Sequence, residues 1–502
     1  MHLKWKILAL IILIYLPVSI DATVLHVALP TLGLTLSATA TELLWIIDIY
    51  SLMMAGLLLP MGVLGDRMGY KKLAILGLII FGFSSLFAAL STSPMMLIVA
   101  RAFLAVGAAM ILPATLSGVR STFTDDAERA MALGLWTTIG VAGAAIGPLV
   151  GGYLLQYFYW GSVFLINIPI VIIAIIGILW IVPAQKENPA QQWQIGKALL
   201  LIIGILMTIY ALKSFIKMDG NLLLPITLGV LGIALLIYFV RRELQLENPM
   251  FDFGLLKERT LAIGVIIAIT AMISMVGFEF VMAQELQFVY GFTPLKAGLF
   301  MLPLMLASGL GGPIAGWLVA RFGLRAVATI GIGISAISFF GLAFTNIMTQ
   351  TYLVWGFLIL LGLSIGIALL ASTTAIMSAA PPEKSASAGA IEGMAYELGA
   401  GFGVVFFGMF LTLIFSHHIM VPADLLPEQA QMASSSINQA FLVAEQLSNQ
   451  EAAQRLVETA RESFVFAHFF LLLLSGILLS LLTVIVWRFL PKRMITSGSI
   501  SH

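Results

Sequence analysis

The sequence has 502 residues, of which 60% are hydrophobic and only 10% are charged. Soluble domains carry about 25% charged residues, so this composition excludes an ordinary soluble protein. The formal net charge is +1 and cysteine is absent, which excludes a broad basic surface for nucleic acid, a disulfide framework and a thiolate metal site.

Apolar runs of about 20 residues recur along the whole chain, as expected of helices that cross a bilayer. We predict fourteen membrane-spanning helices. In chain order they cover residues 7–30, 43–64, 73–92, 95–119, 131–155, 162–182, 197–216, 221–240, 261–284, 295–320, 326–346, 352–378, 388–416 and 463–489. The first follows Lys4 and Lys6 but is longer than the apolar core of a signal peptide, so we expect it to be retained.

The basic residues predict how these helices are oriented. With the N-terminus in the cytoplasm, most of the 25 Lys and Arg lie on the cytoplasmic side, and Lys213 is one of the few assigned to the outside. Cytoplasmic loops of membrane proteins are rich in Lys and Arg. Both the N-terminus and the C-terminus are therefore expected to be cytoplasmic.

An internal repeat divides the chain. "GVLGDRMGYKKLAILG", which begins at Gly62, matches "GWLVARFGLRAVATIG", which begins at Gly316. Both segments follow helices of the same orientation, and such a repeat indicates a transporter with two parallel halves. The predicted domains are a six-helix half at 1–182, two inserted helices with a cytoplasmic linker at 183–260, a second six-helix half at 261–490 and a cytoplasmic tail at 491–502.

A segment of unusual length at 417–462 is predicted to lie outside the membrane. It includes "AFLVAEQLSNQEAAQRLVETARESF", whose apolar spacing predicts an amphipathic helix near the outer surface. The segment is interpreted as a structured connector, and a role in gating access to the substrate stays open.

The Gly62 segment resembles the loop 2–3 signature of the major facilitator superfamily, Gly-x-Leu-x-Asp-Arg-x-Gly-x-Lys-Lys, with Lys71 as its first lysine. Glycines at 62 and 69 permit a tight cytoplasmic turn. Asp66 and Arg67 can bridge to neighbouring helices or to a helix end. Such contacts would hold one face of a transporter shut.

"GVAGAAIGPLVGG" at 140–152 resembles the antiporter motif of the same superfamily. Its small residues allow close helix packing, and its proline allows a bend. The residues concerned are Gly143, Gly147, Pro148, Gly151 and Gly152.

Four further segments resemble the fourteen-helix drug/proton antiporters, especially the quaternary-ammonium and methyl viologen efflux pumps. They are "VSIDATVLHVALP" at 18–30, "LLWIIDIYSLMMAG" at 43–56, "FYWGSVFLINIP" at 158–169 and "AIEGMAYELGAGFG" at 390–403. The resemblance implies an all-α membrane protein with the major facilitator fold, two six-helix halves and two inserted helices.

The same resemblance implies a function. Such pumps sit in the bacterial inner membrane and export lipophilic mono- and dications, such as quaternary ammonium compounds, ethidium and methyl viologen, in exchange for protons. No cofactor is expected beyond the proton gradient, and no nucleic acid partner. Because the repeat suggests a complete pathway within one chain, a monomer is expected to function in the lipid bilayer.

Carboxylates inside apolar spans point to the coupling chemistry. A charged side chain at the centre of a bilayer costs about 2.5–3.5 kcal/mol on insertion scales, so such groups usually face a cavity or a partner. A cation beside a carboxyl group favours its ionised form and expels the proton, and re-protonation releases the cation. The predicted proton- or cation-binding residues are Asp21, Asp48, Glu279, Glu392 and Glu397.

Two aromatic residues accompany these acids. Trp45 lies one helical turn before Asp48, and Tyr396 lies one turn after Glu392, so each ring and carboxylate can bracket a cation. Glu397 need not share that face. Glu285, near the outer end of its helix, is expected to reach water and is left out of the predicted site.

Arg101 in the fourth helix matches a position that the resemblance associates with proton coupling, and an ion pair that only joins two helices stays the alternative. His26 is expected to be a packing residue rather than a proton relay.

Two alternatives stay open. A dedicated exporter of a natural metabolite such as a polyamine would share the fold, and a passive channel is a more remote possibility. An enzyme is disfavoured because six scattered His and no Cys supply no metal or nucleophile cluster. A Walker-type nucleotide motif is also absent, so energy is expected to come from an ion gradient.

Overall fold

The computed structural model describes residues 2–183, 195–217, 223–246, 249–381 and 384–491. Within these ranges the chain forms helices and no strands, which confirms the all-α prediction. Parts of the predicted linker (184–194, 218–222 and 247–248) and the predicted tail after its first residue lie outside the described residues.

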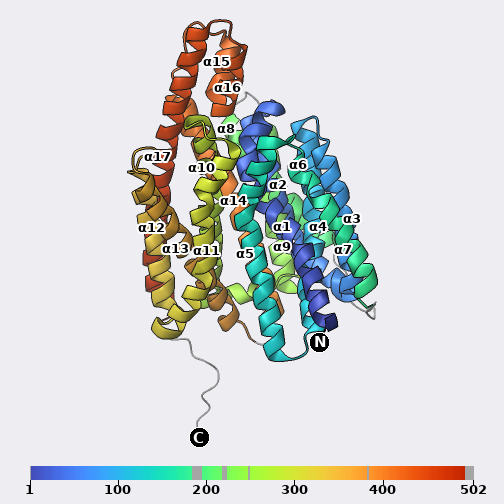
Figure 1. Ribbon diagram of the computed structural model, residues 1–502. Helices are drawn as coiled ribbons and strands as arrows, with labels where there is room; N and C mark the ends of the chain where they lie inside the picture. The colour runs from blue at the N-terminus through green and yellow to red at the C-terminus, as the bar shows by residue number, and fades with distance from the viewer. Residues whose placement is uncertain (1, 184–194, 218–222, 247–248, 382–383, 492–502) are drawn as a thin grey trace. The chain divides into compact units, whose positions relative to one another are not determined.

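Fourteen helices of the described residues are long and apolar enough to cross a membrane, which confirms the predicted number. Figure 1 draws each of them as a coiled ribbon. They are α1 (His2–Thr35), α2 (Ala40–Met68), α3 (Tyr70–Ala89), α4 (Pro94–Thr122), α5 (Asp126–Tyr157), α6 with α7 (Ser162–Leu165 and Asn167–Ile181), α8 (Ile195–Lys217), α9 (Leu223–Gln245), α10 (Arg259–Gln284) with the π-helical turn Glu285–Val289, α11 (Pro294–Phe322), α12 (Leu324–Ala343), α13 (Thr351–Ala379), α14 (Ser385–His418) and α17 (Gln450–Phe489).

Local sequence explains where several of these helices begin. Thr39 precedes α2 and forms a capping box with Glu42, each side chain accepting from the backbone N–H of the other. Ser93 caps α4, whose first residue is Pro94, a residue suited to that position. Asp125 caps α5 by accepting from the backbone N–H of Glu128.

The predicted sixth helix is divided into α6 and α7, with a break at Ile166. Pro169 lies in the first turn of α7 and has no N–H to donate to the carbonyl of Leu165. The hydrogen-bond ladder of one continuous helix is therefore interrupted at this point.

The outer segment at 417–462 is helical, as predicted, but its arrangement differs from the prediction. Its chain forms α15 (Pro427–Ser435), α16 (Ile437–Gln446) and the beginning of α17, and the Arg461 guanidinium of α17 lies 5.7 Å from the ring centroid of Phe441 on α16. The α17 helix has 40 residues, so it is ~60 Å long, about twice the ~30 Å hydrocarbon core. The sequence at 450–462 therefore continues the last span and does not lie along the surface.

The repeat found in the sequence forms the same turn twice. Gly69 joins α2 to α3 with φ 85° and ψ 146°, and Gly323 joins α11 to α12 with φ 83° and ψ 156°. Side chains with a Cβ atom rarely adopt this backbone region, which explains the glycines. Gly62 was expected in the same turn, but it lies inside α2, where a Cβ atom would be 3.8 Å from Pro113.

The chain divides into two compact units. Unit 1 comprises Met1–Arg241, Val276–Leu302 and Ala400–His468, and unit 2 comprises Arg242–Met275, Pro303–Gly399 and Phe469–His502. The outer parts of α10, α14 and α17 pack with helices of the first repeat and so belong to unit 1. The predicted division at 1–182, 183–260 and 261–490 follows the repeat instead, and it stays a prediction.

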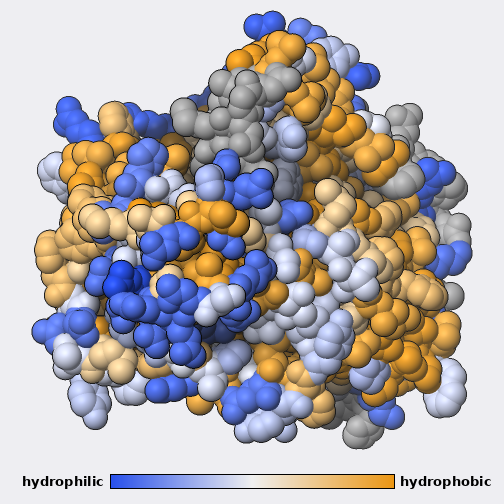
Figure 2. Space-filling model, turned by 90° about the horizontal axis from the view of Figure 1, so that it is seen from above, coloured by the Kyte–Doolittle hydropathy of each residue, from blue (hydrophilic) through white to orange (hydrophobic). Residues whose placement is uncertain are grey.

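Large apolar side chains are exposed on many helices. Phe83, Leu223 and Phe344 are among the most exposed, and Figure 2 shows broad orange areas of hydrophobic residues on the surface. Apolar areas of this extent are expected where helices face lipid rather than water.

Candidate functional site

Asp21 and Arg101 form a buried ion pair in unit 1. Each side chain is almost wholly buried, and Arg101 Nη1 on α4 donates a hydrogen bond to Asp21 Oδ2 on α1. Arg101 Nε also donates to the backbone carbonyl of Ile46, with an N–O distance of 3.2 Å. The guanidinium carbon lies 4.4 Å from the ring centroid of Tyr50. Arg101 therefore connects α1 and α4 to two points on α2.

The antiporter motif holds the helix that carries Asp21. Gly143, Gly147 and Gly151 of α5 face α1, and Thr23 Oγ1 donates to the carbonyl of Ala144 at 2.8 Å. This contact requires glycine, because a Cβ atom on Gly147 would lie 2.1 Å from Thr23 Oγ1. The motif is thus an α1–α5 packing surface.

The end of the motif packs elsewhere. A Cβ atom on Gly152 would lie 2.6 Å from the Cα atom of Leu295, and one on Gly298 would lie 2.6 Å from the carbonyl oxygen of Pro148. The close packing of α5 therefore continues from α1 onto α11.

Asp48 and Trp45 share one face of α2, as predicted, and the cation between them belongs to the chain itself. Lys213 Nζ of α8 lies 2.5 Å from Asp48 Oδ2 and 3.7 Å from the ring centroid of Trp45. Lys213 is buried, so its assignment to the outside was wrong. Its place inside the predicted span 197–216 was the available signal, because a lysine in a membrane helix needs a partner.

Two Glu–His pairs lie along α10 and its π-helical turn. His26 Nδ1 lies 3.1 Å from Glu279 Oε2, and His468 Nδ1 contacts Glu285 Oε2. All four side chains are buried. His26 thus faces a carboxylate, and its role as a packing residue stays a prediction.

Glu285 was expected to reach water, and this expectation was wrong. Glu285 is 5% exposed because α17 covers it with His468. It belongs to the π-helical turn, a feature that is often found at functional sites. The sequence did not predict this cover, because α17 begins at Gln450, before the predicted span 463–489.

Glu392 is the centre of a small hydrogen-bond network in unit 2. Thr373 Oγ1 of α13 and the Tyr396 hydroxyl, at 2.8 Å, both donate to Glu392 Oε1. The predicted shared face of Glu392 and Tyr396 is confirmed. Tyr396 meets the carboxylate with its hydroxyl group. Glu397 is half-buried on the same helix, α14.

The residues of the predicted cytoplasmic gate lie at the end of α2 and at the beginning of α3. Asp66 and Arg67 are exposed at the end of α2. Lys71 Nζ donates to the carbonyl of Val182 at 2.5 Å. Lys71 thus contacts the end of α7, and Asp66 interacts electrostatically with Arg120 of α4. The predicted gate role of Asp66 and Arg67 stays a prediction.

The outer ends of α1 and α2 are closed by later parts of the chain within unit 1. Asn438 Nδ2 and Gln439 Nε2 of α16 donate to the carbonyl of Ala38, at 3.1 and 2.7 Å. Close packing follows between α2 and α14, because a Cβ atom on Gly408 would lie 2.2 Å from Leu44 Cδ2. These contacts close unit 1 at the end that is predicted to face outward.

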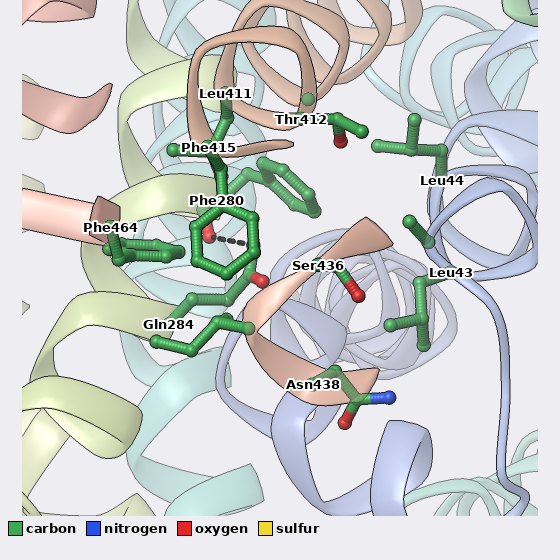
Figure 3. Close-up of a pocket in the computed structure, with 13 residues that line it drawn as sticks. Leu43, Leu44, Phe280, Gln284, Leu411, Thr412, Phe415, Ser436, Asn438 and Phe464 are labelled. Atoms are coloured by element: carbon green, nitrogen blue, oxygen red, sulfur yellow. Dashed lines mark hydrogen bonds between the residues drawn. The ribbon is translucent and has the colours of Figure 1, made fainter. Parts of the chain in front are cut away.

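A small cavity of about 30 Å³ lies beneath this closure. Figure 3 shows Leu43 and Leu44 of α2 on one side and three phenylalanines on the other. Its lining residues are Ala40, Leu43, Leu44, Phe280, Gln284, Gly408, Leu411, Thr412, Phe415, Ser436, Ile437, Asn438 and Phe464. The amide of Gln284 is engaged, donating to the Phe280 carbonyl at 3.2 Å. A cavity of this size has room for about one or two water molecules, and none of these lining residues is charged.

Comparisons with known proteins agree with this architecture. The profile of the Major Facilitator Superfamily matches residues 11–404. The chain is 52% identical to methyl viologen resistance protein SmvA of Salmonella typhimurium strain LT2, over 98% of this chain and 99% of that protein. It is 35% identical to multidrug efflux pump LfrA of Mycolicibacterium smegmatis, over 92% of this chain and 91% of that protein.

Solved structures share the fold. A bacterial homolog of the human lysosomal transporter Spinster, in an inward-facing and unoccupied conformation, matches 98% of this chain and 98% of its own with a TM-score of 0.67 and 18% identity. The extent of the family match and the identity to SmvA settle the family. The chain belongs to the Major Facilitator Superfamily and is a membrane transporter, not an enzyme.

Proposed function

We propose that this transporter is a proton-coupled antiporter that exports lipophilic mono- and dications from the bacterial cytoplasm. The names of SmvA and LfrA support a cationic, drug-like cargo, since methyl viologen is a dication. The observation that carries the coupling is the buried pair of Asp21 and Arg101. Asp21 is buried among apolar helices beside a guanidinium that stays charged. It can therefore exist in two states, ionised and paired with Arg101, or protonated and neutral.

The chemistry of the pair follows from its contacts. The Arg101 guanidinium stays charged under all physiological conditions, so a proton that enters the pair must go to Asp21. Protonation removes the charge that attracts Arg101, while Arg101 keeps its bond to Ile46 and its contact with Tyr50. The α1–α4 contact therefore weakens, while the guanidinium stays bound to α2. A proton-driven conformational change requires such a contact that weakens on protonation.

The cargo charge is proposed to be met by Asp48 and Glu392, each with an aromatic residue one turn away. The apolar part of the cargo is proposed to enter at the small apolar cavity lined by Leu44, which would have to widen to receive it. Leu44 lines this cavity and lies four residues before Asp48, so the cavity and the carboxylate occupy neighbouring positions on one side of α2. Glu279 and Glu397 are proposed as further proton-binding groups.

The proposed setting is the bacterial inner membrane, with both termini in the cytoplasm and one chain as the working unit. The orientation rests on the excess of Lys and Arg in the predicted cytoplasmic loops. With that orientation, the closure at Ala38 faces outward, and the cargo enters from the cytoplasm.

The test is transport of ethidium and of methyl viologen into proteoliposomes under an imposed pH gradient. Wild type is compared with Asp21→Asn, and Glu451→Gln serves as a matched control because its carboxylate is exposed. We expect gradient-driven transport in wild type and in the control, and its loss in Asp21→Asn. Flux that ignores the gradient would exclude antiport. Transport of a polyamine but of neither cation would favour the dedicated exporter.

A further inference from the structure

Lys213 occupies the place that a ring and a carboxylate would offer to a substrate cation. Its ammonium group contacts Asp48 at 2.5 Å and the Trp45 ring at 3.7 Å, and both charged side chains are buried. It comes from α8, one of the two helices inserted between the six-helix halves. The two-fold repeat itself does not require this helix.

The site is poorly suited to an ammonium group. A lysine carries three N–H donors, yet among the described residues the structure gives the Lys213 ammonium no polar partner besides Asp48. The contrast with Arg101 is clear, because Arg101 donates to a backbone carbonyl as well as to its carboxylate. A buried donor without an acceptor has lost its water without replacement.

The site is well suited to a cation that has no hydrogen to donate. A quaternary ammonium or pyridinium ion is attracted by one negative charge and by the face of an aromatic ring, and Asp48 and Trp45 supply both. Such an ion leaves no donor unsatisfied. Its apolar body would point toward the small apolar cavity at Leu44, one turn away on the same helix, and would widen that cavity on binding.

We propose that Lys213 is a tethered placeholder cation, which occupies the Trp45–Asp48 site when the cargo is absent and leaves it when a lipophilic cation binds. The inference deepens the proposed export of such cations and rests on it. Lys213 keeps the buried Asp48 neutralised between cycles, so the empty site does not expose an unpaired charge. It also competes with the cargo, which sets the affinity and helps the cargo to leave.

Equilibrium binding tests this competition without any proton gradient, so its outcome is separate from that of the transport assay. Ethidium affinity is measured by fluorescence in detergent for wild type, Lys213→Gln and the double variant Asp48→Asn/Lys213→Gln. Removal of the placeholder is expected to tighten ethidium binding at least tenfold. The double variant has lost the attracting charge too, and it is expected to bind more weakly than wild type.

A chemical rescue sharpens the assignment. The chain has no cysteine, so Lys213→Cys creates a single thiol. Alkylation of this thiol with 2-bromoethylamine restores an ammonium group on a side chain of similar length. We expect tight binding before alkylation and a return to wild-type affinity after it, whereas a role in packing alone would give no such reversal.

Wild type supplies a measurement that needs no variant. If the cargo displaces Lys213, tetraphenylphosphonium should increase the labelling of Lys213 by an amine-reactive probe, read by mass spectrometry, while labelling of exposed Lys72 stays constant. A Lys213→Gln protein with wild-type affinity overturns the proposal. A Lys213→Gln protein that folds only when Asp48→Asn is also present would overturn it as well. The same holds if tetraphenylphosphonium leaves the labelling of Lys213 unchanged, because each of these results describes a permanent structural ion pair.

Discussion

Gly147 of α5 lies so close to Thr23 of α1 that a Cβ atom would come within 2.1 Å of the threonine hydroxyl oxygen. Replacement of Gly147 by alanine must therefore push apart the helix that carries Asp21. We expect Gly147→Ala to lose about 1–3 kcal/mol, the usual cost of overpacking, and to lower the thermal unfolding midpoint. Gly134→Ala is the control on the same helix, since a Cβ atom there meets nothing within 4 Å. Equal stability of the two variants would contradict the packing role of the motif.

Removal of Arg101 leaves Asp21 buried without its partner. Loss of one member of a buried ion pair typically costs about 3–5 kcal/mol, so Arg101→Ala should be poorly stable in detergent. The double variant Arg101→Ala/Asp21→Asn should regain part of that loss because no lone charge remains. Arg455→Ala provides the comparison: its pair with Glu451 is exposed, and exposed pairs contribute about 0–1 kcal/mol. Additive losses in the double variant would speak against a coupled pair.

The contact between Glu285 and His468 predicts a different pair of variants. Glu285→Ala removes the acceptor from a buried imidazole and should cost about 1–3 kcal/mol in stability. Glu285→Gln keeps an acceptor oxygen in the same place and should cost less. Thermal unfolding of both proteins checks the order, and equal losses would mean that the hydrogen bond contributes little.

The absence of cysteine makes the outer closure testable by cross-linking. In the double variant Leu44→Cys/Gly408→Cys, the short distance between these positions should let the two thiols form a disulfide across α2 and α14. Oxidation should then lock the outer side shut and stop export, and a reductant should restore it. Oxidant should not change the transport rate of either single-cysteine variant. Undiminished transport by a fully cross-linked protein would show that this side does not open.

Tyr396 could act through its ring face, as a contact for a cation, or through its hydroxyl group, as a hydrogen-bond donor, and the sequence could not distinguish these two roles. Its hydroxyl donates to Glu392 at 2.8 Å. We therefore expect Tyr396→Phe, which keeps the ring, to raise the KM for methyl viologen nearly as much as Tyr396→Leu. If the ring face alone mattered, Tyr396→Phe would behave like wild type. Purified protein of equal thermal stability is needed for both measurements.

The sequence predicted those features that depend on short-range patterns. Apolar runs defined the fourteen spans because bilayer thickness sets their length, and the repeated Gly69 and Gly323 marked one turn in each half because that backbone region excludes other residues. The shared faces of Trp45 with Asp48 and of Glu392 with Tyr396 followed from helical spacing alone.

What the sequence did not reveal was which distant side chain neutralises each buried acid. Lys213, His26 and His468 meet their carboxylates only through packing between helices far apart in the chain. Helical spacing holds no information about such pairs. The length of α17 was missed for a related reason, because its first turns are too polar to be recognised as part of a span.

The pairing of Lys213 with Asp48 also has a consequence for the history of the fold. A shortened protein without α8 and α9 would retain both repeats, yet it would place an unpaired carboxylate inside the bundle. Loss of the two additional helices should therefore require either a change of residue 48 or another side chain that neutralises it. Among relatives, chains of twelve spans should have a neutral residue at this position or neutralise the acid from another helix, so the number of spans and the chemistry of one side chain should change together.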